Sequence, residues 1–258
     1  MDQFLKNLIK EAGALAKSFF DQGLGAYTTK MDPDDILTEA DTTVSDFIIQ
    51  KIQAEYPDHY IFTEEAGEVV NKGAEYQWIV DPIDGTRNFA AGIPTWCILI
   101  TLLHNEETIM AGMYNPVSDQ LYFAKKGEGS YLNDRRIFVS KTPDIDYAFG
   151  HCSRSNRRSH QKEFANALVW LITKTKARIG NYGSMISTGS LAAGGMDFHI
   201  TNGGVDHDYL GAILIAQEAG AVVTDCEGSP WQRGRNDLII ANPILHPKLL
   251  AAFKAANL

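Results

Sequence analysis

Cysteine is scarce in this sequence of 258 residues, which has three in all. Cys97, Cys152 and Cys226 lie far apart and form neither a Cys-x-x-Cys pair nor the Cys/His spacing of a zinc site. Isolated cysteines in odd number exclude a disulfide-stabilised scaffold and are typical of a reducing compartment. We therefore expect a cytoplasmic protein.

Long apolar runs and an excess of positive charge are also missing. No apolar stretch reaches the roughly 18 residues that a membrane-spanning helix needs, and the N-terminal residues predict an amphipathic helix rather than a signal peptide. Lysine and arginine number 23 against 32 acidic residues, which gives a net charge of −9. This balance excludes a general nucleic-acid-binding surface, which is normally basic. A phosphorylated small molecule can bind such a chain only where a cation is recruited locally.

The order of the expected elements divides the chain into two halves. Two amphipathic helices come first, the second of them capped by Asp41 or by the pair Thr42–Thr43. Short apolar strands separated by turn residues then predict a mostly antiparallel sheet, with a hairpin at Asn133–Asp134 between strands 131–132 and 137–139. After about residue 145, expected helices and strands alternate, which favours layered α/β packing. We expect an α+β half over residues 1–145 and a smaller mixed α/β half over 146–258, sharing one core.

The most informative stretch is the sequence WIVDPIDGT, residues 78–86. An apolar strand runs directly into Asp81 and Asp84, and the intervening proline stiffens the exit from the strand. A turn there can bring both carboxylates together with the carbonyl oxygen of Ile83, and oxygen ligands of this kind suit Mg²⁺. Gly85 and Thr86 then present backbone N–H groups at an expected helix start, where a phosphate can bind.

Other carboxylates also stand at the ends of apolar elements. An Asp-x-x-Asp turn on its own more often caps a helix or closes an Asx-turn. Here, however, Glu64 and Glu65 follow a short strand, and Asp208 stands at the start of an apolar helix. Two like charges about 4 Å apart repel by about 4 kcal/mol at an effective dielectric constant of 20. A cluster of these carboxylates would therefore need bound cations.

Three motifs in this order resemble the inositol monophosphatase family of Mg²⁺-dependent, lithium-sensitive phosphatases. The segment Asp81–Thr86 is similar to the family's first signature. Thr63-Glu64-Glu65 resembles its Gly-Glu-Glu metal motif, and Asp208 stands ten residues before Glu218-Ala219-Gly220, the spacing of its second signature. Further similar segments extend the resemblance over nearly the whole chain, namely Lys30, Thr38 to Asp41, Gly183–Ser184 and 192–197.

The resemblance implies a fold, a metal site and a reaction. The fold would be a sugar-phosphatase-like αβαβα sandwich, and a homodimer would be its usual assembly. One Mg²⁺ would be held by Glu64, Asp81 and the Ile83 carbonyl, and a second by Asp81, Asp84 and Asp208, with a third, weaker ion near Glu64. The resemblance implies catalytic roles for Glu64, Asp41 and Thr86, of which Asp41 and Thr86 position and help deprotonate the attacking water, while the N–H groups of Gly85 and Thr86 bind phosphate.

Departures from the family pattern fall on the substrate side, where the family's substrate-side loop corresponds to Gly183 and Ser184. His207 replaces the usual tryptophan before the metal-binding aspartate, and Thr201 stands where animal enzymes have a glutamate that contacts inositol hydroxyls. Arg87, and Arg154 further along, are candidates for contacting a second anionic group. We therefore expect a phosphomonoesterase for a small polyol, sugar or amino-alcohol phosphate.

Two alternatives remain open from the sequence. The same chemistry would serve fructose 1,6-bisphosphate, 3′-phosphoadenosine 5′-phosphate or histidinol phosphate. In an alternative of another class, the protein is a regulator that binds a partner, such as the transcription machinery, and its phosphatase activity is incidental.

Overall fold

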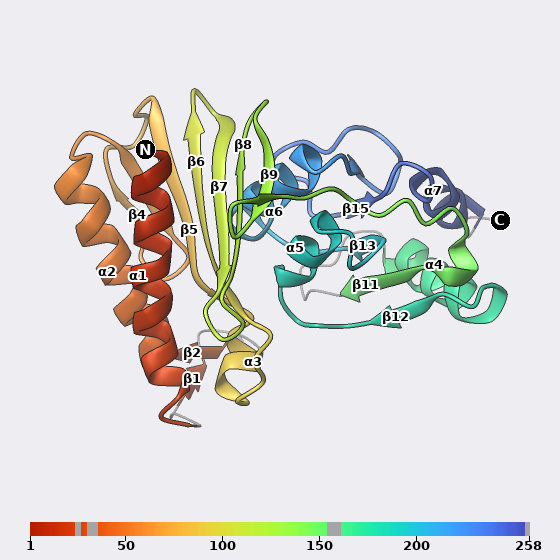
Figure 1. Cartoon of the computed structure of the whole chain (residues 1–258), viewed down its shortest axis with the longest axis horizontal. Helices are drawn as coiled ribbons and strands as arrows, with labels where there is room; N and C mark the ends of the chain where they lie inside the picture. Colours follow the sequence, from red (N-terminus) through yellow and green to blue (C-terminus); the bar gives the residue numbers. More distant parts are fainter. Residues whose placement is uncertain (24–26, 30–35, 154–160, 256–258) are drawn as a thin grey trace.

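A computed structural model gives the structure of the chain and describes residues 1–23, 27–29, 36–153 and 161–255. Lys30 and Arg154, which the sequence analysis singled out, lie outside these residues. Helices and sheets alternate in five layers across the molecule (Figure 1). In order, the layers are α1 (Asp2–Phe20) with α2 (Glu39–Glu55), an eight-stranded sheet, α5 (Ile186–Ala192) with α6 (Asp206–Glu218), a five-stranded sheet, and α4 (Gln161–Lys174) with α7 (His246–Ala255). The expected αβαβα sandwich is confirmed.

The eight-stranded sheet is antiparallel except for one pair of strands. Strand β3 runs parallel to β5, and all other neighbours are antiparallel. Its strands in spatial order are β10 (Arg135–Arg136), β9 (Gly129–Leu132), β8 (Gln120–Lys125), β7 (Glu107–Asn115), β6 (Cys97–His104), β5 (Tyr76–Asp84), β3 (Tyr60–Thr63) and β4 (Gly67–Val70). The parallel pair matters for function because β3 and β5 end at the same edge of the sheet.

The five-stranded sheet is mixed, as expected for the second half of the chain. Strand β11 pairs in parallel with both of its neighbours, and the remaining pairs are antiparallel. Its strands in spatial order are β12 (Arg178–Gly180), β11 (Phe149–Ser153), β13 (Phe198–Thr201), β15 (Leu238–Ala241) and β14 (Val222–Thr224). Smaller elements are the ribbon of β1 (Tyr27–Thr29) and β2 (Ile36–Thr38), the short helix α3 (Thr86–Ala90) and a 3₁₀ turn, Ile145–Tyr147. The division of the chain between residues 145 and 146 stays a prediction.

Helix α1 attaches to the first sheet through one apolar side. Leu5, Ile9, Ala12 and Ala16 recur at helical spacing and are fully buried. Gly112 on β7 makes room for this contact, because a Cβ atom there would lie 2.5 Å from a methyl carbon of Leu5. The absence of a side chain at Gly112 therefore allows the helix to approach the sheet closely.

Helix α6 is apolar all round because it lies between the two sheets. Every residue from Tyr209 to Ala216 is buried, so the helix has no polar stripe. On one side Gly211 faces Thr101 and Ala111 of the first sheet. On the other side, Leu214 belongs to the same apolar cluster as Ile240 of β15. This packing fixes the start of α6, and with it Asp208, against the first sheet.

Three local expectations needed correction. Helix α2 starts earlier than expected: Thr38 caps it, and Asp41 is the third helical residue, whose carboxylate accepts a hydrogen bond from the Thr38 N–H. The hairpin at Asn133–Asp134 is present, but its second strand is Arg135–Arg136 rather than 137–139. Strand β4 was not expected, because Gly67–Val70 is only partly buried and short. Among the described residues, no helix is long and apolar enough to cross a membrane.

Two buried histidines predict a pH dependence of stability. The rings of His151 on β11 and His199 on β13 meet edge to face at 4.3 Å. Burial lowers the pKa of His151 to about 4 and that of His199 well below its ordinary value of 6.5. Between pH 6.5 and 4, the unfolded chain therefore binds protons at these positions that the folded chain does not bind. The contribution of these two histidines to the free energy of unfolding therefore decreases as the pH falls.

The variant His199→Phe isolates this contribution. Phenylalanine cannot be protonated, so the variant does not lose this stability as the pH falls. The difference in free energy of unfolding, variant minus wild type, should therefore increase by about 1.4 kcal/mol for each pH unit below 6.5. Urea denaturation of both proteins at pH 7.5, 6 and 5 measures this difference. A difference that stays constant over the three pH values would contradict the prediction.

Candidate active site

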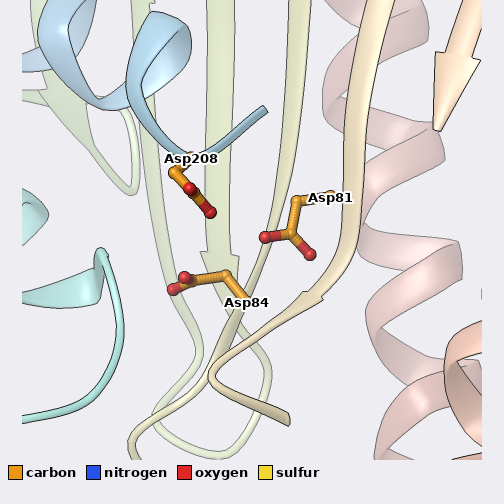
Figure 2. Close-up of side chains that lie close together, drawn as sticks. All are labelled: Asp81, Asp84 and Asp208. Carbon is orange, nitrogen blue, oxygen red and sulfur yellow. The ribbon is translucent and has the colours of Figure 1, made fainter. Parts of the chain in front are cut away.

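A bulge in β5 turns two carboxylates to the same side. In a regular strand, residues three positions apart point to opposite faces. Here Asp81 pairs with Leu99 and Asp84 with Cys97, so that β5 gains one extra residue over β6 between them. Pro82, which has no N–H for a ladder hydrogen bond, lies within this irregular stretch. The extra residue reverses the alternation, and both side chains point to one place (Figure 2).

The third carboxylate comes from helix α6. Asp208 is the third residue of this helix, and one of its oxygens accepts a hydrogen bond of 2.8 Å from the N–H of Val205. Asp81, Asp84 and Asp208 each offer an oxygen, and these oxygens all lie within 4.8 Å of one another. Figure 2 shows the three carboxylates turned toward a common point between β5 and α6. The sequence motifs are thus brought together although they lie far apart in the chain.

The electrostatics of this cluster are unfavourable for bare carboxylates. Asp81 and Asp84 are only 2% and 8% exposed. Burial, followed by the charges of Glu64, Asp84 and Asp208, raises the pKa of Asp81 well above its ordinary value. Burial also raises the pKa of Asp84 to about 7, although the Ser184 hydroxyl partly opposes this shift. Oxygen ligands that repel one another when ionised fit a hard divalent cation such as Mg²⁺.

Glu64 lies beside this group rather than within it. It follows β3, and its N–H donates to the Val80 carbonyl on the parallel neighbour β5 at 3.0 Å. Its charge contributes more than that of any other residue to the raised pKa of Asp81. His207 stacks on Phe62 with a centroid distance of 5.9 Å, and its Nε2 atom lies 3.9 Å from carboxylate oxygens of both Glu64 and Asp208. His207 thus combines a packing contact with proximity to the acidic group.

Asp41 and Thr86 meet next to the cluster. The Thr86 hydroxyl lies 3.3 Å from one oxygen of Asp41 and 3.0 Å from the carbonyl oxygen of Ile83. The other Asp41 oxygen accepts hydrogen bonds from the N–H and the hydroxyl of Thr38, at 2.8 and 2.5 Å. Burial, opposed by these hydrogen bonds, raises the pKa of Asp41 to about 6. The first turn of α2 therefore fixes a buried carboxylate against a hydroxyl that also contacts β5.

Gly85 turns the chain from β5 into helix α3. Its φ is +88°, a conformation that L side chains rarely adopt, and a Cβ atom there would lie 3.0 to 3.3 Å from Ser184, Gly183 and Thr95. The Ser184 hydroxyl and the N–H of Met185, the latter at 2.6 Å, both donate to the same oxygen of Asp84. The substrate role of Ser184 stays a prediction, and the structure shows that this residue holds Asp84.

Asn88 is a residue of the site that the sequence analysis missed. Its side-chain amide donates to the carbonyl oxygens of Thr95 and Tyr182, each at 2.6 Å. It therefore ties α3 to the loop that carries Gly183 and Ser184. No spacing or motif in the sequence indicates a contact between residues so far apart.

A cavity of about 300 Å³ opens next to the cluster. It contains the expected substrate-side residues together with two metal-binding candidates. The residues that line it include Asp84, Arg87, Gly183, Ser184, Thr201 and Asp208. The cavity also has walls that were not expected, among them His151 and Asn181. A ligand in this cavity would therefore touch the carboxylate cluster at one end.

Comparison with known proteins identifies the family. A sequence model of the inositol monophosphatase family matches residues 1–258. The chain belongs to the inositol monophosphatase family. The inositol-1-monophosphatase of Bacillus subtilis is 31% identical over 264 residues, covering 100% of this chain and 97% of the relative. The Nus factor SuhB of Vibrio cholerae is 30% identical over 217 residues, covering 84% and 81%.

Solved structures of family members share the fold. The extragenic suppressor protein suhB of Bartonella henselae has a TM-score of 0.90 and 26% identity, with 98% of this chain and 97% of that chain covered. The IMPase of Thermotoga maritima has a TM-score of 0.87 and 25% identity, with 97% and 95% covered.

Proposed function

We propose that this protein is a Mg²⁺-dependent phosphomonoesterase that hydrolyses a small phosphorylated alcohol, such as a polyol, sugar or amino-alcohol phosphate. The observation that carries the proposal is the convergence of Asp81, Asp84 and Asp208 within 4.8 Å, at the end of a cavity of about 300 Å³. Membership of a phosphatase family supports it. We further propose a cytoplasmic homodimer, on the evidence of the family resemblance and of three buried, free cysteines.

Five groups are proposed to hold the ions. One Mg²⁺ would be bound by Glu64, Asp81 and the Ile83 carbonyl. A second would be bound by Asp81, Asp84 and Asp208, and a third would lie near Glu64. When bound, Mg²⁺ neutralises charge on the phosphate and makes water a better nucleophile at neutral pH. The hydrogen bonds from Ser184 and Met185 to Asp84, and from Val205 to Asp208, hold these carboxylates in place beforehand.

Asp41 and Thr86 are proposed to accept the proton that the attacking water loses. The Thr86 hydroxyl would donate a hydrogen bond to Asp41 and accept one from the attacking water, which orients that water toward phosphorus. As the water attacks, its proton would pass to the Thr86 oxygen while the hydroxyl proton of Thr86 passes to Asp41. A carboxylate with a pKa of about 6 is suited to accept a proton near neutral pH. The N–H groups of Gly85 and Thr86 at the start of α3 would bind phosphate oxygens, and the alcohol part would occupy the cavity beside Arg87 and Thr201.

The variants Thr86→Val and Thr86→Ser test this arrangement in a panel of phosphorylated metabolites. With Mg²⁺ present, the wild type should release phosphate from at least one member. Because valine removes the hydroxyl that links water to Asp41, kcat should fall by about 10²- to 10⁴-fold, the usual range for lost acid–base catalysis, with little change in KM. The serine variant, which keeps the hydroxyl, should retain most of the activity. The absence of phosphate release from the whole panel would overturn the proposed function.

A second candidate function is partner binding. The observation that favours it is that similar proteins of Vibrio cholerae and Neisseria meningitidis are named Nus factor and putative Nus factor SuhB. A strain that carries Asp84→Asn separates the two functions, because the change removes a metal-binding charge and leaves the surface of the protein unaltered. A phenotype of the gene that survives this loss of hydrolysis would support partner binding.

A further inference from the structure

His151 lies in the cavity wall in a fixed hydrogen-bonding state. It sits in the middle of β11, between β12 and β13, and is 1% exposed. Its Nδ1 atom accepts a hydrogen bond of 3.1 Å from the N–H of Tyr182. Because burial lowers its pKa to about 4, the ring is neutral at pH 7 and carries a single proton. A ring nitrogen that accepts a hydrogen bond carries no proton, so the proton is on Nε2.

The Nε2–H of His151 is available to a ligand. Among the described residues, the one hydrogen bond of this ring is the one that its Nδ1 atom accepts from Tyr182. His151 lines the same cavity as Asp84 and Asp208. A ligand in this cavity that supplies an acceptor can therefore form a hydrogen bond with this N–H group.

The other polar groups of this wall are mainly donors. The side-chain oxygen of Asn181 already accepts from the N–H of Gly183 at 3.0 Å, which leaves its NH₂ group for a ligand. The guanidinium of Arg87, which also lines the cavity, can only donate hydrogen bonds. Apart from Asp84 and Asp208, the described lining contains no carboxylate. The wall therefore complements acceptor atoms rather than hydroxyl donors.

We propose that His151 is a specificity-determining residue, whose Nε2–H binds an anionic oxygen on the alcohol part of the phosphoester. The anionic group is a carboxylate or a second phosphate, which both present acceptors only. This inference rests on the proposed function, since the alcohol part must occupy the cavity while its phosphate lies at the carboxylate cluster. Hydrogen bonds to charged acceptors are stronger than those to neutral ones, which favours an anionic group over a neutral hydroxyl.

Two substitutions of His151 test the roles of its two ring nitrogens separately. His151→Asn keeps an acceptor near the position of Nδ1 for the Tyr182 N–H and removes the donor at Nε2. His151→Gln can place its amide NH₂ near the position of Nε2 and so keeps the donor. Phosphate release is measured with Mg²⁺ on fructose 1,6-bisphosphate, which carries a second phosphate, on 2-phosphoglycerate, which carries a carboxylate, and on glycerol 2-phosphate, which carries neither.

The expected result is a change in KM for charged substrates only. The wild type should have a higher kcat/KM on one anionic substrate than on glycerol 2-phosphate, and which of the two is preferred shows whether phosphate or carboxylate is bound. His151→Asn should raise KM for that substrate about 10- to 100-fold, as expected for a lost hydrogen bond to a charged group, with kcat nearly unchanged. His151→Gln should restore much of the loss, and glycerol 2-phosphate should be hydrolysed equally by all three proteins.

Each other result has a definite meaning. If the wild type hydrolyses glycerol 2-phosphate as well as or better than both anionic substrates, the inference is overturned and the proposed function stands. Equal losses on all substrates in folded His151→Asn, verified by thermal unfolding, would show a structural role and also overturn the inference. If the wild type hydrolyses none of the three substrates and nothing in the metabolite panel, the proposed function fails first, and the inference with it.

Discussion

Replacement of Asp81 by asparagine is expected to lower kcat/KM for phosphate release about a thousandfold, because a metal ion's stabilisation of the transition state is worth several kcal/mol. Asp81 is the carboxylate that both proposed ions share, and it is 2% exposed. Asparagine has nearly the same shape and can still accept the hydrogen bond that the Ile83 N–H donates to Asp81 at 3.1 Å. The loss would therefore follow from the charge rather than from a change in the fold.

The same substitution should stabilise the protein in the absence of divalent ions. The charges of Glu64, Asp84 and Asp208 all raise the pKa of Asp81. Removing one of several buried like charges should raise the free energy of unfolding at pH 7 by about 2 kcal/mol in chelator. Asp58→Asn, at an exposed position between α2 and β3, is the matched control and should change neither quantity. Full activity of Asp81→Asn in metal-free buffer would refute the proposed site.

Removal of Mg²⁺ from the wild type should abolish phosphate release and lower the melting temperature. An ion that binds only the folded state stabilises it by about 2.7 kcal/mol at a concentration of 100 Kd. For a chain of this size, that free energy corresponds to about 5 to 10 °C, which differential scanning calorimetry measures directly. Added Mg²⁺ should restore both quantities, and the family resemblance further predicts inhibition by lithium.

The Asp81→Asn variant provides the control for this second experiment. If the melting temperature rises because Mg²⁺ occupies the cluster, Mg²⁺ should raise it much less in the variant than in the wild type. An equal rise in both proteins would place the stabilising ion elsewhere. A wild type that keeps its full activity after chelation would contradict the proposed Mg²⁺ dependence.

The sequence predicted the parts of the site that are local in the chain. Asp81, Ile83, Asp84 and Thr86 fall within six residues, so their spacing alone indicates a strand end with converging oxygens. The alternation of apolar elements predicted layered α/β packing, the family resemblance implied the five-layer sandwich, and the structure confirms both. Asp208 was predicted because its helix is apolar and its distance from Glu218 matches a family signature.

The contacts between distant segments could not be predicted. The donation from Asn88 to Tyr182 and the position of Ser184 against Asp84 depend on how the 181–185 loop meets α3, which no local pattern encodes. The protonation state of His151 likewise follows from its contact with Tyr182, on a segment adjacent in space only. Thr38, rather than Asp41, caps α2 because the Asp41 carboxylate turns back to the Thr38 N–H.

The origin of the three carboxylates has a consequence for the order of events during synthesis. Asp81 and Asp84 leave the ribosome together, but Asp208 follows only after β6 to β13 have been made. Until α6 docks between the sheets, a nascent chain would present two of the three acidic groups. Catalytic competence would therefore arise late and in one step, and its recovery after dilution from denaturant would report the docking of this one helix.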